Sequence, residues 1–183
     1  MGYFAVIDTE TNWADEVMSI GTVIADTDTF RQVAAKYHIL PLECAVGGMF
    51  SDVLFLDTPV NPILCSREKA MEDLSCWLKK FGVSSIFAYN ASFDRNHLPQ
   101  LRGFDWHDIM CLAIYRQHNP KIPDCADCYS TGRLKRGYGV EAMLRLLSGN
   151  DTYRETHNAL LDAMDELEIV RLLGHGIGEY SKL

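Results

Sequence analysis

The sequence has no long apolar run and no excess of positive charge. It contains no stretch of about 18 consecutive apolar residues, so we expect no membrane-spanning segment. Of its 183 residues, 17 are basic and 25 are acidic, and the net charge of −8 argues against non-specific binding of nucleic acid over the whole surface. This balance is compatible with a local basic groove, and with a set of acids that work with bound cations.

Targeting signals and a paired-cysteine framework are also missing. The first residues, MGYFAVIDTE, contain neither a basic stretch nor a cleavage site, and we therefore expect a cytoplasmic protein with reduced thiols. Four cysteines stand alone, and we expect most of them to be small core residues; they are Cys44, Cys65, Cys76 and Cys111. Cys125 and Cys128 form the only C-x-x-C, where structural zinc would need two further ligands, His118 being the nearest candidate.

Hydrophobic periodicity predicts strands first and then alternating strands and helices. The expected strands cover 2–8, 18–26, 34–40, 84–89 and the start of 106–112, and the first three are spaced as an antiparallel meander. The expected helices cover 66–81, 92–101, 140–147 and 157–173. This order predicts an α/β fold with a mixed sheet of about five strands flanked by helices. We expect one domain over residues 1–183, with a long loop inserted at 118–137.

Acidic residues stand at the edges of three apolar elements. Asp8 and Glu10 end an apolar strand, in which residues i and i+2 point to the same side of the sheet. Asp94 falls near a helix start, where the helix dipole alone would explain it. Asp162 lies beside the apolar stripe of the last helix and could be one of several solvated acids there. Together, however, four carboxylates placed in this way can converge on one point, and oxygen ligands suit Mg²⁺ or Mn²⁺.

The segments IDTE, NASFD and HNALLDA resemble, in this order, the three exonuclease motifs of the DEDDh 3′–5′ exonucleases. That family includes polymerase proofreading domains, RNase T and oligoribonucleases, on a ribonuclease H-like fold. The resemblance spans residues 3–173, and the five-residue step from His157 to Asp162 is its histidine-type signature. It implies that two divalent ions bind to Asp8, Glu10, Asp94 and Asp162, and that His157 is the general base. The implied reaction releases nucleoside 5′-monophosphates from the 3′ ends of single-stranded DNA or RNA.

The candidate substrate-binding residues have more than one interpretation from the sequence. Trp13 follows the first motif where many relatives have a glycine, and it could stack on the 3′-terminal base or simply cover the sheet edge. The stretch TGRLKRGYG is either a solvated loop or a local basic patch for single-stranded nucleic acid. The candidate substrate-binding residues are Thr11, Trp13, Asn90, Phe93, Arg133, Lys135 and Arg136.

Two other hypotheses assume the same fold but a different function for the protein. One is a docking subunit that binds a polymerase or another nucleic-acid-processing partner. Another is a zinc-stabilised redox or interaction protein built on Cys125 and Cys128. A homodimer is a further expectation, because dimers are frequent among free-standing members of the resembled family. The choice between DNA and RNA stays open, because loops that the sequence does not position would read the 2′-hydroxyl group.

Overall fold

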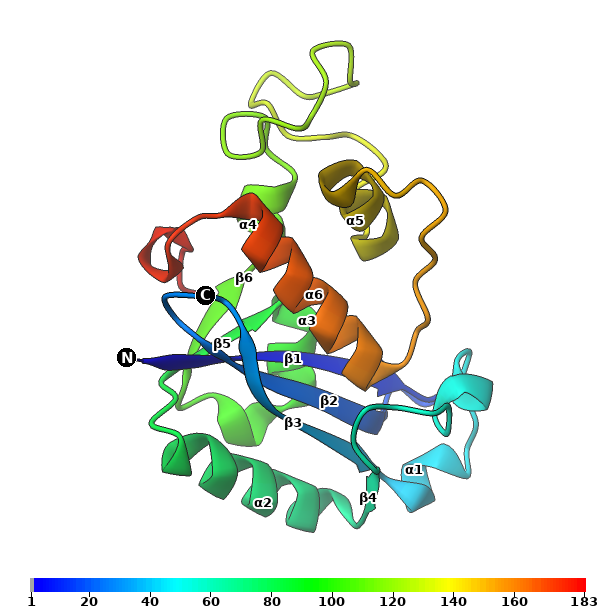
Figure 1. The fold of residues 1–183 in the computed structure, drawn as a ribbon. Coiled ribbons are helices and arrows are strands. Elements are labelled where there is room, and N and C mark those ends of the chain that lie inside the picture. The colour runs from blue at the N-terminus through cyan, green and yellow to red at the C-terminus, as the bar shows by residue number, and fades with distance from the viewer. Residues whose placement is uncertain (1) are drawn as a thin grey trace.

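The computed structural model describes residues 2–183, which form a six-stranded mixed sheet with helices on both faces (Figure 1). The strands are β1 (Tyr3–Thr11), β2 (Val17–Asp26), β3 (Gln32–Ile39), β4 (Ile63–Leu64), β5 (Ser85–Ala88) and β6 (Asp105–Asp108). Their order across the sheet is β4-β3-β2-β1-β5-β6. β1, β2 and β3 pair antiparallel, which confirms the predicted meander, while β5 runs parallel to β1 and β6 runs parallel to β5.

The sheet has one strand more than the expected five. The extra strand, β4, is two residues long, pairs parallel with β3 at the sheet edge, and is exposed on both residues. So short a strand has no alternation of apolar and polar residues to reveal it. β1 also extends three residues further than expected, to Thr11, so Glu10 lies within the strand together with Asp8.

The helices are α1 (Pro41–Cys44), α2 (Arg67–Lys80), α3 (Ser92–His97), α4 (Met110–Ala113), α5 (Val140–Ser148) and α6 (Ala159–Leu173). The helix expected over 92–101 is split, and α3 ends at His97 before a 3-10 turn at Pro99–Leu101. The cause is Pro99, whose ring disfavours helical geometry at the preceding residue and cannot donate a backbone hydrogen bond.

Side-chain alternation along β1 divides the core in two. Phe4 and Val6 pack with residues of α5 and α6, whereas Ala5 and Ile7 pack with residues of α2 on the other face. Figure 1 shows α6 crossing β1 and β2, with which it makes most of its contacts. Asp8 and Glu10 continue the even-numbered series of β1, and they therefore belong to the face that α6 covers.

α6 approaches the sheet most closely at Gly21 of β2. A Cβ atom on Gly21 would lie 2.0 Å from the carbonyl oxygen of Ala159, the first residue of α6. Gly21 pairs with Asp8 on one side and with Tyr37 on the other. The Asn158 side chain caps α6 and donates to the Tyr37 hydroxyl at 3.1 Å. The start of α6 is therefore seated on the sheet beside Asp8.

The segment 118–137 has no helix or regular strand among the described residues, as expected for a loop, but it is ordered by its own hydrogen bonds. The Arg116 guanidinium donates to three carbonyl oxygens of the loop at 3.2–3.3 Å, those of Pro123, Asp124 and Ala126. Isolated bridges join Tyr115 to Arg133 and Cys128 to Leu134. Across residues 2–183, no helix has the length and apolar character needed to cross a bilayer.

All six cysteines are free thiols, and the expectation that most single cysteines lie in the core is only partly met. Cys44 and Cys65 are half-buried against core residues. Cys76 and Cys111 are exposed, because they lie on the outward sides of α2 and α4.

Candidate active site at the carboxyl edge of the sheet

The predicted catalytic residues come from elements that meet at one edge of the sheet. β1 ends there with Asp8 and Glu10, and the parallel strand β5 leads through a turn into α3, which carries Asp94 in its first turn. α6 begins over the same edge with Asp162 in its first turn. Carboxyl ends of parallel strands are the usual place for binding sites in α/β folds.

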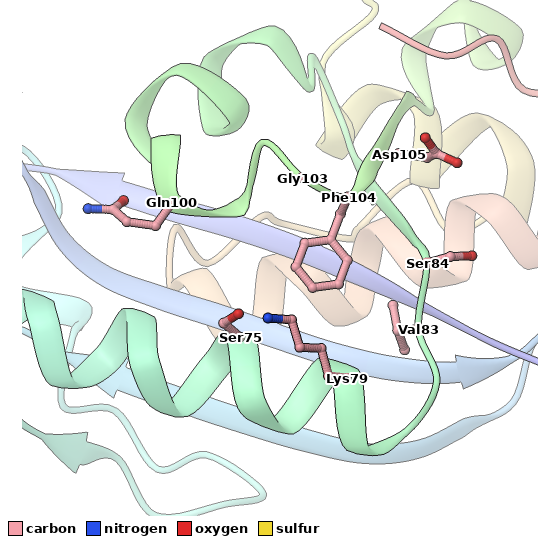
Figure 2. Close-up of a pocket in the computed structure, with 8 residues that line it drawn as sticks. All are labelled: Ser75, Lys79, Val83, Ser84, Gln100, Gly103, Phe104 and Asp105. Atoms are coloured by element: carbon pink, nitrogen blue, oxygen red, sulfur yellow. The ribbon is translucent and has the colours of Figure 1, made fainter.

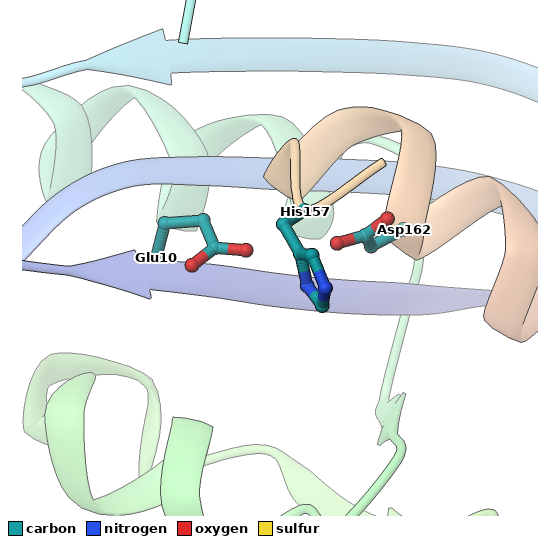
Figure 3. Close-up of side chains that lie close together, drawn as sticks. All are labelled: Glu10, His157 and Asp162. Carbon is teal, nitrogen blue, oxygen red and sulfur yellow. The ribbon is translucent and has the colours of Figure 1, made fainter. Parts of the chain in front are cut away.

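Glu10, His157 and Asp162 lie closest together (Figure 3). One ligand atom from each of the three side chains lies within 4.8 Å of the other two. Within residues 2–183, no other group of three or more histidine, cysteine or acidic side chains is close enough to share an ion in this way. Asp8 and Asp94 lie near these three residues, since the charges of Asp94, Asp162 and Glu10 act on Asp8 and the charge of Asp94 acts on Glu10.

The acids of the cluster are buried, and burial raises their pKa values. Asp94 is 2% exposed, Asp162 is 3% exposed and Glu10 is 9% exposed. Burial, followed by repulsion from neighbouring acids, raises the pKa of Glu10 to about 8 and that of Asp162 to about 8. Burial and then the charge of Glu166 raise the pKa of Asp8 well above its usual range. Carboxylates crowded in a low-dielectric site are unfavourable unless a positive charge joins them.

Asp94 is held by a neighbour on β1. The Thr9 hydroxyl donates to Asp94 Oδ1 at 2.7 Å. Burial raises the pKa of Asp94 to about 7, and the Thr9 hydrogen bond opposes that rise because it favours the charged form. Thr9 therefore orients the carboxylate and leaves its second oxygen for another partner.

Three buried carboxylate oxygens of the cluster have no hydrogen-bond partner. They are Asp8 Oδ2, Asp162 Oδ1 and Glu166 Oε2. Buried polar atoms are nearly always paired in folded proteins, so these oxygens are suited to bind a cation. A set of carboxylate oxygens without thiolates suits a hard cation such as Mg²⁺ or Mn²⁺.

His157 lies just before α6 and outside the helix, as its spacing from Asp162 predicts. Its backbone has φ of 58°, a conformation that residues with side chains seldom adopt. The next residue, Asn158, holds that conformation by accepting from two N–H groups of α6 and donating to the Val53 carbonyl at 2.8 Å. The His157 ring stacks on Phe50, with ring centroids 4.0 Å apart and planes 16° apart.

Sequence reasoning misses three of these residues, Thr9, Phe50 and Glu166. Glu166 was detectable, because it follows Asp162 by four residues and so lies on the same helix face. Phe50 comes from the irregular segment between α1 and β4, and no sequence pattern pairs it with His157.

A hollow of about 390 Å³ lies beside Glu10, and three candidate substrate-binding residues line it, Thr11, Trp13 and Phe93. Its other lining residues are Asn12, Asp15, Met49 and Phe50. Trp13 is 68% exposed, and its backbone N–H donates to the Gly47 carbonyl at 2.9 Å. A tryptophan that only covered a sheet edge would be largely buried, so this exposure favours an accessible stacking surface.

The remaining candidates are divided between two places. Asn90 and Arg133 line a second hollow of about 380 Å³, in which the Arg133 guanidinium lies over the Tyr138 ring. Asn90 has φ of 62° in the turn after β5, and its N–H donates to Asp108 Oδ1 at 3.0 Å. Lys135 instead pairs with Asp127 of its own loop at 2.9 Å, and Arg136 is exposed. Of the three basic side chains, only that of Arg133 lines this hollow.

Cys125 and Cys128 have no third metal-binding side chain near them among the described residues. The neighbour of the Cys128 sulfur is the Arg116 guanidinium, at 3.5 Å. The Cys128 sulfur thus accepts a hydrogen bond from a charged donor, and zinc at this pair remains an alternative hypothesis.

Another hollow, of about 500 Å³, lies away from the acids (Figure 2). Its lining comes from α2, the residues before β5 and the start of β6: Ser75, Lys79, Val83, Ser84, Gln100, Gly103, Phe104 and Asp105. These positions mark the amino edge of the parallel strands, opposite the carboxylate cluster. No predicted site residue lines it.

Known proteins resemble this chain in structure but not in sequence. Neither a protein-family model nor a curated protein sequence matches the chain. Solved structures do match. The nuclease domain of 3′hExo, a DEDDh family member bound to rAMP, has a TM-score of 0.64 at 17% identity, covering 99% of this chain and 96% of that chain. The chain has the 3′-exonuclease fold.

Two further structures share this exonuclease fold. A 3′-exonuclease described by its recognition of a histone mRNA stem-loop has a TM-score of 0.64 at 17% identity, covering 99% of this chain and 90% of that chain. Exonuclease I of E. coli in complex with a dA16 oligonucleotide has a TM-score of 0.54 at 12% identity, covering 98% of this chain and 42% of that chain. The predicted ribonuclease H-like fold is thereby confirmed.

Proposed function

We propose that the protein is a metal-dependent 3′–5′ exonuclease of the DEDDh type. Its substrates would be the 3′ ends of single-stranded DNA or RNA, and its products nucleoside 5′-monophosphates. One observation carries the proposal: three segments that are far apart in the sequence bring their acids and a histidine to one edge of an exonuclease fold. The residues are Asp8, Glu10, Asp94, His157 and Asp162. The unpartnered buried oxygens of this cluster support a cation-dependent reaction.

Each residue of the cluster then has a role. Asp8, Glu10, Asp94 and Asp162 would hold two Mg²⁺ or Mn²⁺ ions. When bound, such ions activate a water and neutralise negative charge on the attacking and leaving oxygens of a phosphodiester. His157 accepts the proton of the attacking water. Phe50 holds the imidazole ring in place by stacking on it.

We assign substrate recognition to the hollow beside Glu10. Its volume of about 390 Å³ falls in the range of small-ligand pockets. Trp13 and Phe93 would stack on the terminal base, while Thr11 lies at the floor of the hollow at the end of β1. Arg133, beside Asn90, is the candidate for a phosphate contact, and Lys135 and Arg136 would add attraction at longer range. One similar structure is described by its recognition of a histone mRNA stem-loop and another is in complex with a dA16 oligonucleotide, which supports both RNA and DNA as substrates.

The proposal is tested with 5′-labelled single-stranded DNA and RNA oligonucleotides of matched sequence. We expect stepwise shortening in the presence of Mg²⁺ or Mn²⁺ and none in the presence of EDTA. The relative rates on the two oligonucleotides identify the preferred substrate. Failure to shorten either oligonucleotide under any of these conditions would reject the proposal.

Variants separate the roles of metal binding and proton transfer. Asp8→Ala should abolish shortening, whereas His157→Ala should slow it roughly 10²–10⁴-fold while leaving Mn²⁺ binding intact. His175→Ala is the matched control, because His175 lies beyond α6 and contacts Glu179 and the His118 carbonyl. An unchanged rate for His157→Ala would contradict its assignment as general base.

The proposal extends to partners and to cellular location. A docking role or homodimer would use the exposed apolar side chains around α1 and β4, which include Leu42, Val46, Phe55, Ile63 and Leu64. The mass by size exclusion and co-purification with a polymerase test these roles. Six free thiols suit a reducing compartment, and we therefore place the protein in the cytoplasm.

A further inference from the structure

Glu166 is a buried carboxylate that the proposed reaction does not use. It lies in α6 one turn after Asp162, so both side chains leave the same face of the helix. Glu166 is 2% exposed, and its Oε2 atom has no hydrogen-bond partner. The four-carboxylate motif does not include this position, so the motif gives no reason for an acid here.

The surroundings of Glu166 are acidic. Among neighbouring charges, that of Glu166 acts most strongly on Asp8. Burial, and then the charge of Asp94, raise the pKa of Glu166 well above its usual range. Of the ion pairs formed within residues 2–183, none involves Glu166, Asp8, Glu10, Asp94 or Asp162. No ion pair among the described residues therefore neutralises this group of acids.

A bound proton does not complete this arrangement. A protonated Glu166 could donate one hydrogen bond to one neighbouring carboxylate. Three buried oxygens lack partners, on Asp8, Asp162 and Glu166, so one proton would leave at least one of them unpaired. A divalent cation takes six or more oxygen ligands and can satisfy several of these atoms at once.

We propose that Glu166 is a fifth carboxylate of the metal centre and helps to hold a divalent cation near Asp8. The inference rests on the proposed function, which places cations among the other four carboxylates. It deepens that proposal by giving this chain one more negative charge at the site than the motif provides. Removal of that charge should weaken cation binding and make the metal-free protein more stable.

The test compares Mn²⁺ binding by wild type and Glu166→Gln, with free Mn²⁺ measured by electron paramagnetic resonance. Thermal unfolding and exonuclease activity are followed in the same solutions. We expect the apparent Mn²⁺ affinity of Glu166→Gln to fall about tenfold or more. Its metal-free melting temperature should rise, and added Mn²⁺ should raise it less than in wild type.

Glu168→Gln is the matched control. It removes the same charge from the same helix, at a half-buried residue that pairs with Arg171. We expect its Mn²⁺ affinity to equal that of wild type. Glu166→Asp keeps the charge on a shorter side chain, and we expect it to bind Mn²⁺ more weakly than wild type. It serves as the deciding variant if circular dichroism shows that Glu166→Gln does not fold.

The outcomes separate the inference from the proposed function. If wild type binds Mn²⁺ and shortens oligonucleotides, but folded Glu166→Gln or Glu166→Asp binds Mn²⁺ as tightly as wild type, the inference is wrong and the proposed function stands. If Mn²⁺ binding depends on Glu166 but no oligonucleotide is shortened, the metal centre stands and the exonuclease activity is rejected. If wild type neither binds Mn²⁺ nor shortens oligonucleotides, both are rejected.

Discussion

At the scale of single residues, the cluster combines side chains that carry charge with side chains that hold them in place. Thr9 hydrogen-bonds Asp94, and Phe50 stacks on His157. These contacts reduce the number of conformations of the two functional side chains before any substrate binds. Such preorganisation matters because a displacement of about 1 Å can reduce catalysis 10²-fold.

Trp13 is the residue with the clearest predicted effect on substrate affinity. Trp13→Ala should raise the KM for oligonucleotides, because stacking of one base on an aromatic ring contributes about 1–3 kcal/mol. Trp13→Phe should restore most of the affinity, since it keeps a ring. Steady-state kinetics with a labelled oligonucleotide measures the effect. The control is Tyr129→Ala, which removes an exposed aromatic ring from the 118–137 loop, outside the hollow. An unchanged KM for Trp13→Ala would contradict the stacking role.

At the scale of elements, the position of α6 on the sheet decides the geometry of the site. His157 precedes this helix, and Asp162 and Glu166 lie on it, so all three side chains move with it. The helix rests on β2 where Gly21 has no side chain, and its N-terminus is capped by Asn158. Both contacts lie within one residue of the start of α6, where a small shift would displace His157 directly.

Gly21→Ala should therefore reduce both stability and activity. The added methyl group would overlap the Ala159 backbone, and overpacking of this kind lowers the free energy of unfolding by about 1–3 kcal/mol. Urea unfolding measures the stability, and the oligonucleotide assay measures the activity. Gly103→Ala is the control, because nothing lies within 4 Å of its Cβ position. Equal stability of the two variants would show that α6 is not seated at Gly21.

At the scale of the whole molecule, an acidic protein concentrates buried acids at one edge of its sheet. The net charge is −8, and no ion pair within residues 2–183 neutralises the cluster. The folded state therefore holds its cluster acids with raised pKa values. Stability of the whole chain is thereby linked to pH and to divalent cations.

Without metal, the protein should become less stable as the pH rises. Glu10 and Asp162 have ordinary pKa values of 4.5 and 3.8, and each is raised to about 8 in the folded state. Between about pH 4.5 and pH 8 the unfolded state loses protons that the folded state keeps on these two carboxyl groups. The free energy of unfolding is therefore highest at the low-pH end of this range and falls as the pH rises to about 8. At pH values near 8, added Mg²⁺ or Mn²⁺ should restore the stability. Melting temperatures measured with EDTA and with metal check this expectation, and a melting temperature that rises with pH in EDTA would contradict it.

The sequence by itself determined the elements and the main catalytic candidates. Alternation along β1 places Asp8 and Glu10 on one face, and the five-residue step from His157 to Asp162 puts the histidine outside α6. These features are local, because strand and helix periodicity depend on residues that are close in the chain. The same locality explains why the meander, α2 and α5 agree with expectation.

Only the tertiary structure decided which side chains meet across the fold. Phe50 stacks on His157 from an irregular segment, and the charge of Glu166 acts on Asp8 because α6 packs against β1. The same packing separates Arg133 from Lys135, which are two residues apart in the sequence. The physical reason is that these contacts join segments far apart in the chain, and burial of the core, rather than local backbone preference, brings the segments together.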